Sequence, residues 1–242
     1  MLKIIIPLAG PSELFTNAGF NYPKPLIESK GKTLIEWVIE NPTKHKVPIQ
    51  FIFILKEEDV VKFHLNNTLK LLNPTCNIVV LKKQTKGSLC SVLMAVDLLN
   101  DDDELLILNG DQVIDYDFNI FYKYWKDKDA DAGIVIFESV HPRWSYARIE
   151  NNFVVETAEK NPISNNSIAG YYYFKNANQF LNAAFEVIMN DVKYDDNFYI
   201  SPVINQYVLQ NLSIKSYFID KGNYHSFYSP QLLLEFERTK NN

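Results

Sequence analysis

The 242-residue sequence has only two cysteines and no surplus of positive charge. Cys76 and Cys90 lack the spacing of a metal site, and we expect two buried free thiols, as in a protein from a reducing compartment. A net charge of −5 excludes broad nucleic-acid binding, because such binding requires a basic surface. A few local lysines are still enough to hold a small anionic ligand.

Long apolar stretches are missing as well. No segment reaches the roughly 18 apolar residues of a membrane span, and the first residues lack the basic region and small-residue cleavage site of a leader. We therefore predict a cytoplasmic protein without a membrane partner. Hydrophobic residues nevertheless make up 47% of the chain, which is typical of a folded protein with a sizeable core.

The first half of the chain alternates between apolar strands and helices. The strands are expected at 2–8, 50–55, 77–81 and 104–108, and the helices at 33–40, 57–72 and 89–99. Thr33 and Glu36 form a capping-box pattern at the start of the first helix. This alternation predicts a three-layer α/β/α fold around a mainly parallel, mixed sheet.

The second half changes pattern after a helix at 117–126 and a strand at 132–138. Segments 146–149 and 153–157 alternate around a turn at 150–152 and predict a hairpin. The remaining elements are expected to be a strand at 168–174, helices at 177–190, 201–210 and 231–238, and a strand at 214–219. We expect this half to pack on the same sheet and to bind the substrate.

The first of four candidate ligand loops follows the opening strand. The backbone amides near Leu8, Ala9 and Gly10 lie where open α/β sheets bind ligands, and small residues let a base approach them. Lys24, fixed between two prolines, is suited to place a positive charge on a phosphate. The alternative is an ordinary connection with a solvated lysine.

Two further loops offer polar groups at strand ends. Gln84, Gly87 and Ser88 lie at a helix start, where backbone amides and a carboxamide are able to hydrogen-bond to a base edge; the alternative is that Ser88 only caps the helix. Asp111 ends an Asn-Gly-Asp sequence that suits Mg²⁺ shared with substrate phosphates, or that simply forms a turn.

The fourth loop follows the predicted hairpin. Lys160 is placed to neutralise a second phosphate while Glu159 holds a hydroxyl or amine of an acceptor; a solvated charge pair is the alternative. Arg143, Trp144 and Tyr146 lie nearby in the sequence and have the aromatic and cationic character of a pocket lining, or of core and surface residues.

Taken in order, six segments resemble the sugar-1-phosphate nucleotidyltransferases in a short form without a C-terminal extension. The segments are 7–10, 22–26, 84–88, 109–111, 159–160 and 170–171, and the resemblance runs from residue 2 to about residue 235. It implies a GT-A-like, Rossmann-like single domain over 1–242, with a nucleotide-binding half at 1–135 and an acceptor-binding half at 136–242. In that family an acceptor phosphate attacks the α-phosphorus of a nucleoside triphosphate in the presence of Mg²⁺, and pyrophosphate leaves.

The resemblance also implies residue roles. The residues expected around the base are Leu8, Ala9, Gly10, Gln84, Gly87 and Ser88. Lys24 is expected on the nucleotide phosphates, Asp111 on Mg²⁺ and Lys160 on the acceptor phosphate. Glu159 and Gly170 are expected to shape the acceptor pocket.

Two positions depart from the family pattern. Leu14 stands where the family has an arginine that grips the triphosphate, and Glu13 adds a negative charge beside it. Either another cation replaces that arginine, or turnover is weak or lost; the candidates are Lys32, Lys86, Arg143 and Arg148. For the late metal-binding aspartate we favour Asp220, with Ser226 in an alternative register.

The sequence therefore predicts a Mg²⁺-dependent nucleotidyltransferase for capsule or surface-polysaccharide precursors, with CTP favoured over UTP or dTTP. Its acceptor is a sugar phosphate or another small phosphorylated metabolite. One rival is a GT-A-type glycosyltransferase that uses the Asp115-Tyr116-Asp117 sequence as its metal motif. Another is a catalytically silent nucleotide-binding relative. A homodimer is also compatible with the many late tyrosines and phenylalanines.

Overall fold

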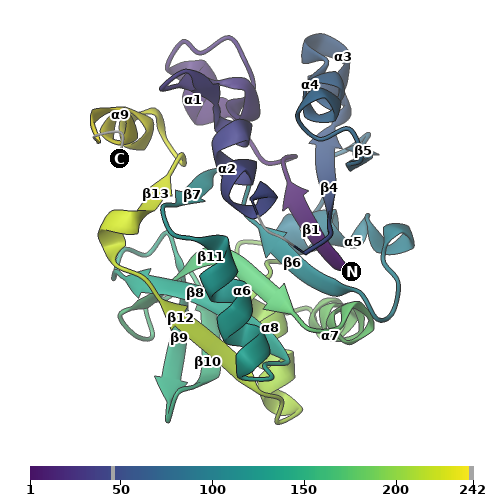
Figure 1. Cartoon of the computed structure of the whole chain (residues 1–242), viewed down its shortest axis with the longest axis vertical. Helices are drawn as coiled ribbons and strands as arrows, with labels where there is room; N and C mark the ends of the chain where they lie inside the picture. Colours follow the sequence, from purple (N-terminus) through teal and green to yellow (C-terminus); the bar gives the residue numbers. More distant parts are fainter. Residues whose placement is uncertain (45–46, 240–242) are drawn as a thin grey trace.

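The computed structural model describes residues 1–44 and 47–239, and its centre is a nine-stranded sheet (Figure 1). The first half contributes parallel strands, as predicted. β1 (Leu2–Pro7) lies between β4 (Ile49–Lys56) and β6 (Glu104–Leu108), and β5 (Asn77–Leu81) pairs with β4. Their carboxyl ends consequently meet at one edge of the sheet.

The second half joins the same sheet and makes it mixed. β11 (Asn166–Phe174) runs antiparallel to β6 and to β8 (Ala132–Glu138), and β12 (Ile214–Phe218) pairs parallel with β8. The predicted hairpin consists of β9 (Ser145–Glu150) and β10 (Phe153–Glu159). Its turn residues Asn151 and Asn152 have φ of +49° and +65°, which suits asparagine in a two-residue hairpin turn.

Helices cover both faces of the sheet and give the three predicted layers. One face packs against α2 (Leu34–Thr43), α4 (Leu65–Leu72) and α6 (Phe118–Asp127). The other packs against α5 (Ser88–Leu93), α7 (Ala177–Met189) and α8 (Ser201–Leu209). Ile4 and Ile6 of β1 face the first layer and Ile5 the second, so the uninterrupted apolar run reflects burial on both sides. Within 1–44 and 47–239, no helix is both long and apolar enough to cross a membrane.

Two predicted helices are shorter than expected. The segment 57–72 is divided into α3 (Glu57–Phe63) and α4, because His64 takes a left-handed conformation with φ of +52°. After α5 the chain forms only a short 3-10 turn, Val96–Leu98. The late tyrosines Tyr171, Tyr172 and Tyr173 are buried in the core, so they do not form a surface for a second subunit.

Several short elements near the ligand edge were not predicted, since each is too brief to show a period. They are α1 (Glu13–Asn17), a 3-10 turn at Lys24–Leu26, β2 (Glu28–Ser29), β3 (Lys32–Thr33), β7 (Gln112–Ile114), a 3-10 turn at Lys221–Asn223 and β13 (Tyr224–Ser226). Pairing of β13 with β7 brings Ser226 opposite Gln112.

The C-terminal helix α9 (Pro230–Arg238) secures α1 from outside the main sheet, and the two helices lie on the same side of the molecule (Figure 1). Phe15 of α1 is fully buried in a separate cluster with Phe227 and Phe236. Packing of Phe15 therefore fixes the segment that departs from the family pattern.

Candidate active site

A cleft of about 600 Å³ lies at the carboxyl ends of β1 and β6 and reaches the β9–β10 hairpin. It gathers all four predicted loops. The predicted residues that line it are Leu8, Ala9, Gly10, Lys24, Gln84, Gly87, Ser88, Asp111, Arg143, Trp144, Glu159 and Lys160.

Lys24 and Asp111 form the charged centre of the cleft. Lys24 Nζ lies 2.8 Å from Asp111 Oδ2, and the two side chains are 17% and 29% exposed. The backbone on each side is held: the Lys24 amide is 3.5 Å from the Ser12 hydroxyl, and the Phe227 amide donates to the Asp111 carbonyl at 2.7 Å. A ligand that binds either charged group must therefore compete with this ion pair.

The loop that carries Gln84 requires a glycine at position 87. The φ of Gly87 is +95°, and an added Cβ would lie 2.2 Å from the Phe198 carbonyl oxygen. That oxygen accepts a hydrogen bond from the Leu89 amide, so α5 starts against residue 198. Ser88 does not cap α5, because the N-cap residue is Gly87 and no side chain caps the helix.

Glu159 is held inside the cleft, at the end of the β9–β10 hairpin, rather than solvated. Its Oε2 accepts hydrogen bonds from the hydroxyls of Ser145 at 2.5 Å and Ser201 at 2.7 Å. Burial raises the pKa of the Glu159 carboxyl, although both hydroxyls and the Lys160 ammonium oppose the rise. The carboxylate is thus fixed in place with one oxygen not engaged by these serines.

Lys160 reaches the cleft from a left-handed backbone conformation with φ of +51°. Its Nζ donates to the Tyr199 hydroxyl at 3.0 Å and lies 4.9 Å and 5.1 Å from the ring centroids of Tyr199 and Tyr194. Burial alone would lower the pKa of Lys160, but the Tyr199 hydrogen bond and the nearby Glu159 produce a net rise. The ammonium consequently stays charged and oriented, as a phosphate ligand must.

Tyr199 also lines the cleft and was missed by sequence reasoning. It follows Lys160 by 39 residues, and no local pattern connects the two. Only the folded chain brings the segment before α8 against the hairpin.

Three predicted site residues do not reach the cleft, and Tyr146 is the first. It is fully buried and donates to the His141 carbonyl at 2.6 Å. Successive side chains of a strand point to opposite faces, so Ser145 faces the cleft and Tyr146 faces the core. The predicted substrate role of Tyr146 is wrong.

Asp220 is the second. It is exposed, precedes the turn Lys221–Asn223 and lies outside the cleft lining, whereas Ser226 lines the cleft. The β7–β13 pairing places Ser226 opposite Gln112, the residue after Asp111. The cleft geometry therefore disagrees with the favoured register at Asp220 and agrees with the alternative register at Ser226.

Gly170 is the third and acts from behind the cleft. Its φ is +66°, and an added Cβ would lie 2.2 Å from Gln112 Nε2 and 2.4 Å from Asn109 Nδ2. The Gly170 carbonyl also accepts from the Asn109 amide at 3.1 Å. It shapes the 109–112 loop and is not itself part of the cleft lining.

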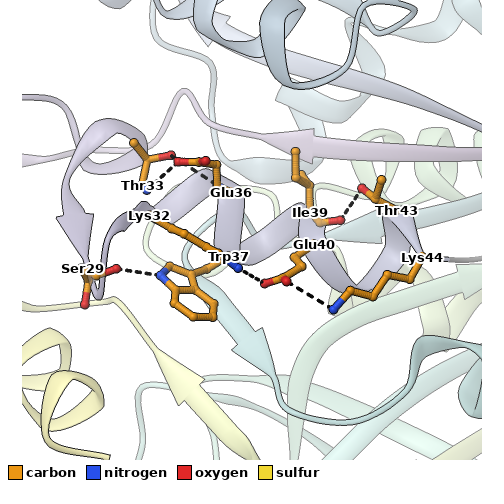
Figure 2. A network of polar contacts seen from close by, with 9 residues as sticks. All are labelled: Ser29, Lys32, Thr33, Glu36, Trp37, Ile39, Glu40, Thr43 and Lys44. Carbon is orange, nitrogen blue, oxygen red and sulfur yellow. Dashed lines mark hydrogen bonds and ion pairs between the residues drawn. The ribbon is translucent and has the colours of Figure 1, made fainter. Parts of the chain in front are cut away.

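Leu14 lines the cleft and is 49% exposed, so the position of the family arginine is apolar and faces the ligand space. Lys32 does not replace the missing charge. Figure 2 shows that it points along α2, where its Nζ lies 2.8 Å from Glu40 and 4.5 Å from the Trp37 ring centroid.

Of the other three candidate cations, only Arg143 lines the cleft. Lys86 pairs with Asp196 at 3.6 Å and Arg148 with Glu156 at 2.9 Å, and neither lines the cleft.

The cleft offers few side-chain oxygen atoms that could bind a metal ion. Within the described residues, no group of three or more His, Cys, Asp and Glu side chains is arranged to hold one. Asp111 and Ser226 supply a carboxylate and a hydroxyl on the same wall. That set fits Mg²⁺, which commonly binds one or two carboxylates together with substrate phosphates and water.

The sequence Asp115-Tyr116-Asp117 has a structural role. The Asp117 side chain accepts from the Asn119 amide at 2.9 Å and caps α6, and the Asp115 amide donates to the Asn223 carbonyl. Neither aspartate lines the cleft, which disfavours the glycosyltransferase reading.

Comparison with known proteins agrees with this geometry. A family model described as nucleotidyl transferase matches residues 18–234. The chain belongs to the nucleotidyl transferase family, which confirms the family predicted from the ordered motifs.

The chain is 30% identical over 183 residues to the bifunctional protein GlmU of Methanocaldococcus jannaschii, an alignment that covers 72% of this chain and 40% of that protein. It spans less than half the length of the curated relatives it matches.

Among solved structures, a nucleoside-diphosphate-sugar pyrophosphorylase from Vibrio cholerae RC9 has a TM-score of 0.85 and 24% identity, over 98% of this chain and 100% of that chain. An inositol-1-phosphate CTP transferase from T. maritima has a TM-score of 0.74 and 11% identity, over 99% and 98% of the two chains. These likenesses establish a shared fold.

Proposed function

We propose that the protein transfers a nucleoside monophosphate from a nucleoside triphosphate to a small phosphorylated acceptor and releases pyrophosphate. The observation that carries the proposal is the meeting of Lys24, Asp111 and Lys160 in one cleft of a nucleotidyl transferase family member. Phosphoryl chemistry of this kind depends on positioning and charge neutralisation, which two lysines and a carboxylate supply.

In the proposed reaction an oxygen of the acceptor phosphate forms a bond to the α-phosphorus, and the bond from that phosphorus to the leaving pyrophosphate oxygen breaks. Lys24 binds the nucleotide phosphates, Lys160 binds the acceptor phosphate, and Glu159 binds a hydroxyl or amine of the acceptor. Asp111, with Ser226 beside it, would hold Mg²⁺. The bound ion would supply neutralisation of phosphate charge.

The substrates follow the order predicted above: CTP, then UTP or dTTP, with a sugar phosphate or a smaller phosphorylated metabolite as acceptor. The likeness in fold to an inositol-1-phosphate CTP transferase supports testing CTP among the triphosphates. Precursors of capsule or surface polysaccharide are the proposed products. Residues 1–135 supply the nucleotide side and 136–242 the acceptor side.

The exposed Leu14 beside Glu13 favours a second candidate, a relative that binds nucleotide without turnover. A pyrophosphate-release assay separates the two. It combines CTP, UTP, dTTP and GTP with a panel of sugar phosphates and other phosphorylated acceptors in the presence of Mg²⁺. Release that needs both substrates supports the transferase. Binding of a triphosphate without release in any combination would support the silent relative instead.

A further inference from the structure

Arg143 is the arginine of the cleft. The chain has three arginines, Arg143, Arg148 and Arg238. Arg148 and Arg238 lie outside the cleft lining, and Arg148 pairs with carboxylates on its own hairpin. Arginine differs from lysine because its guanidinium presents a planar set of donors that matches a phosphate. An arginine that lines the cleft is therefore well suited to bind a phosphate group there.

The side chain of Arg143 is held by three rings. Its Nε and Nη2 lie 3.1 Å from His141 Nδ1 and Nε2, respectively, and its guanidinium carbon lies 5.4 Å and 5.8 Å from the ring centroids of Trp144 and Tyr228. The partners described for it are thus an imidazole and two rings rather than a carboxylate. A guanidinium has five N–H donors, so this arrangement fixes its direction and leaves donors for a ligand.

Residues 226–228 connect Arg143 with Asp111. The Arg143 guanidinium lies over the Tyr228 ring, 5.8 Å from its centroid, and the Tyr228 amide donates to the Ser226 hydroxyl at 3.2 Å. The preceding Phe227 amide donates to the Asp111 carbonyl. Arg143 and Asp111 both line the cleft, so a ligand bound there is able to contact both.

The two lysines of the cleft each have a carboxylate beside them, so a triphosphate needs a further positive charge. Lys24 is paired with Asp111, and Lys160 lies next to Glu159 in the chain. The α1 side of the cleft presents Glu13 and Leu14 instead of a cation. A nucleoside triphosphate brings several negative charges, and neutralising them needs a further donor.

We propose that Arg143 binds a nucleotide phosphate beside Asp111 and supplies, from the hairpin side of the cleft, the positive charge that Leu14 does not provide. This role rests on the proposed function. It assigns Arg143 to the nucleotide rather than to the acceptor.

The test is a calorimetric titration of the whole chain with inorganic pyrophosphate and with CTP, UTP, dTTP and GTP, each with Mg²⁺. Arg143→Gln should weaken binding of pyrophosphate and of the preferred triphosphate by about tenfold or more, as for a lost charge-assisted pair. Arg143→Lys should recover part of the affinity. Arg148→Gln, in the neighbouring strand β9 but outside the cleft lining, should change the affinity less than about twofold.

A double variant sharpens the assignment. Leu14→Arg added to Arg143→Gln should regain triphosphate affinity, since it returns a cation to the opposite wall. Thermal unfolding of each variant shows whether the fold is kept. Arg143→Gln that is folded and binds pyrophosphate and triphosphate like the wild type would overturn the role of Arg143.

These outcomes are distinct from failure of the proposed function. A wild-type chain that binds no triphosphate and no pyrophosphate overturns both proposals. A wild-type chain that binds and transfers, with an Arg143→Gln variant that does the same equally well, overturns only the role of Arg143.

Discussion

The two walls of the cleft are built in different ways. The wall proposed to bind the nucleotide is shaped at two points by glycine, with Gly10 beside the end of β1 and Gly87 packed against residue 198. The wall proposed to bind the acceptor consists of side chains that hydrogen-bond to one another, with Glu159 between two serines and Lys160 on Tyr199. Substitutions at a glycine that fixes the backbone alter the shape of the cleft. Substitutions among side chains that contact the ligand alter which ligand binds. The nucleotide wall is therefore expected to define the reaction, and the acceptor wall its specificity.

Lys24→Ala should have the largest effect, because Lys24 and Asp111 form the charged centre of the cleft. We expect a loss of about a hundredfold to a thousandfold in kcat at saturating acceptor, typical of removing a charge-stabilising group. The fold should persist, since Asp111 is part-exposed and water solvates it. Pyrophosphate release and thermal unfolding measure the two effects. Activity equal to that of the wild type would remove Lys24 from the mechanism.

Lys160→Ala should affect the acceptor wall alone. We expect the KM for the phosphorylated acceptor to rise by about tenfold to a hundredfold while the affinity for triphosphate stays within about twofold. Lys86→Ala is the matched control, because Lys86 is 66% exposed and lies outside the cleft lining. An equal loss of triphosphate affinity in Lys160→Ala would show that the walls are not separate.

Gly87→Ala tests whether the nucleotide wall is set by its backbone. The positive φ and the contact with the Phe198 carbonyl should cost about 1–3 kcal/mol of unfolding free energy, together with triphosphate affinity. Gly10→Ala is the control: its added Cβ meets no described atom within 4 Å, so stability should stay near that of the wild type. Chemical denaturation of both variants makes the comparison. Equal stability of the two would refute the backbone requirement at Gly87.

Tyr199→Phe should have the smallest effect. It removes the hydroxyl that Lys160 bonds but keeps the ring, so the acceptor KM should rise about three- to tenfold with kcat nearly unchanged. In Tyr194→Phe the ring over Lys160 remains and the KM should stay within about twofold. If both variants behaved like the wild type, the Tyr199 hydroxyl would have no part in orienting Lys160.

The main sheet could be predicted because burial on two faces leaves a strong local signal. The segments 77–81, 104–108 and 132–138 fold as strands with the predicted bounds. The capping box of Thr33 and Glu36 is also present and starts α2 as expected. Short elements such as β7 and β13 were missed because only their mutual pairing makes them strands.

Site residues, too, could be predicted where a local sequence signal marks them and were missed where only a distant contact does. Lys24 and Asp111 directly follow local features, a proline-bounded turn and a strand end, and they were placed in the cleft from sequence. Ser226 reaches the cleft through β13, a strand that was not predicted, so the sequence offered no reason to favour Ser226 over Asp220. Tyr199 depends on a contact between distant segments, which no local pattern records.

The most direct test of the account is a phosphorus NMR spectrum of the wild-type chain incubated with Mg²⁺, the preferred triphosphate and a phosphorylated acceptor. The account predicts a new pair of diphosphate-ester signals together with an equal amount of inorganic pyrophosphate, and neither in the absence of acceptor. Unchanged substrates, or hydrolysis of the triphosphate to mono- or diphosphate without the joined product, would contradict it.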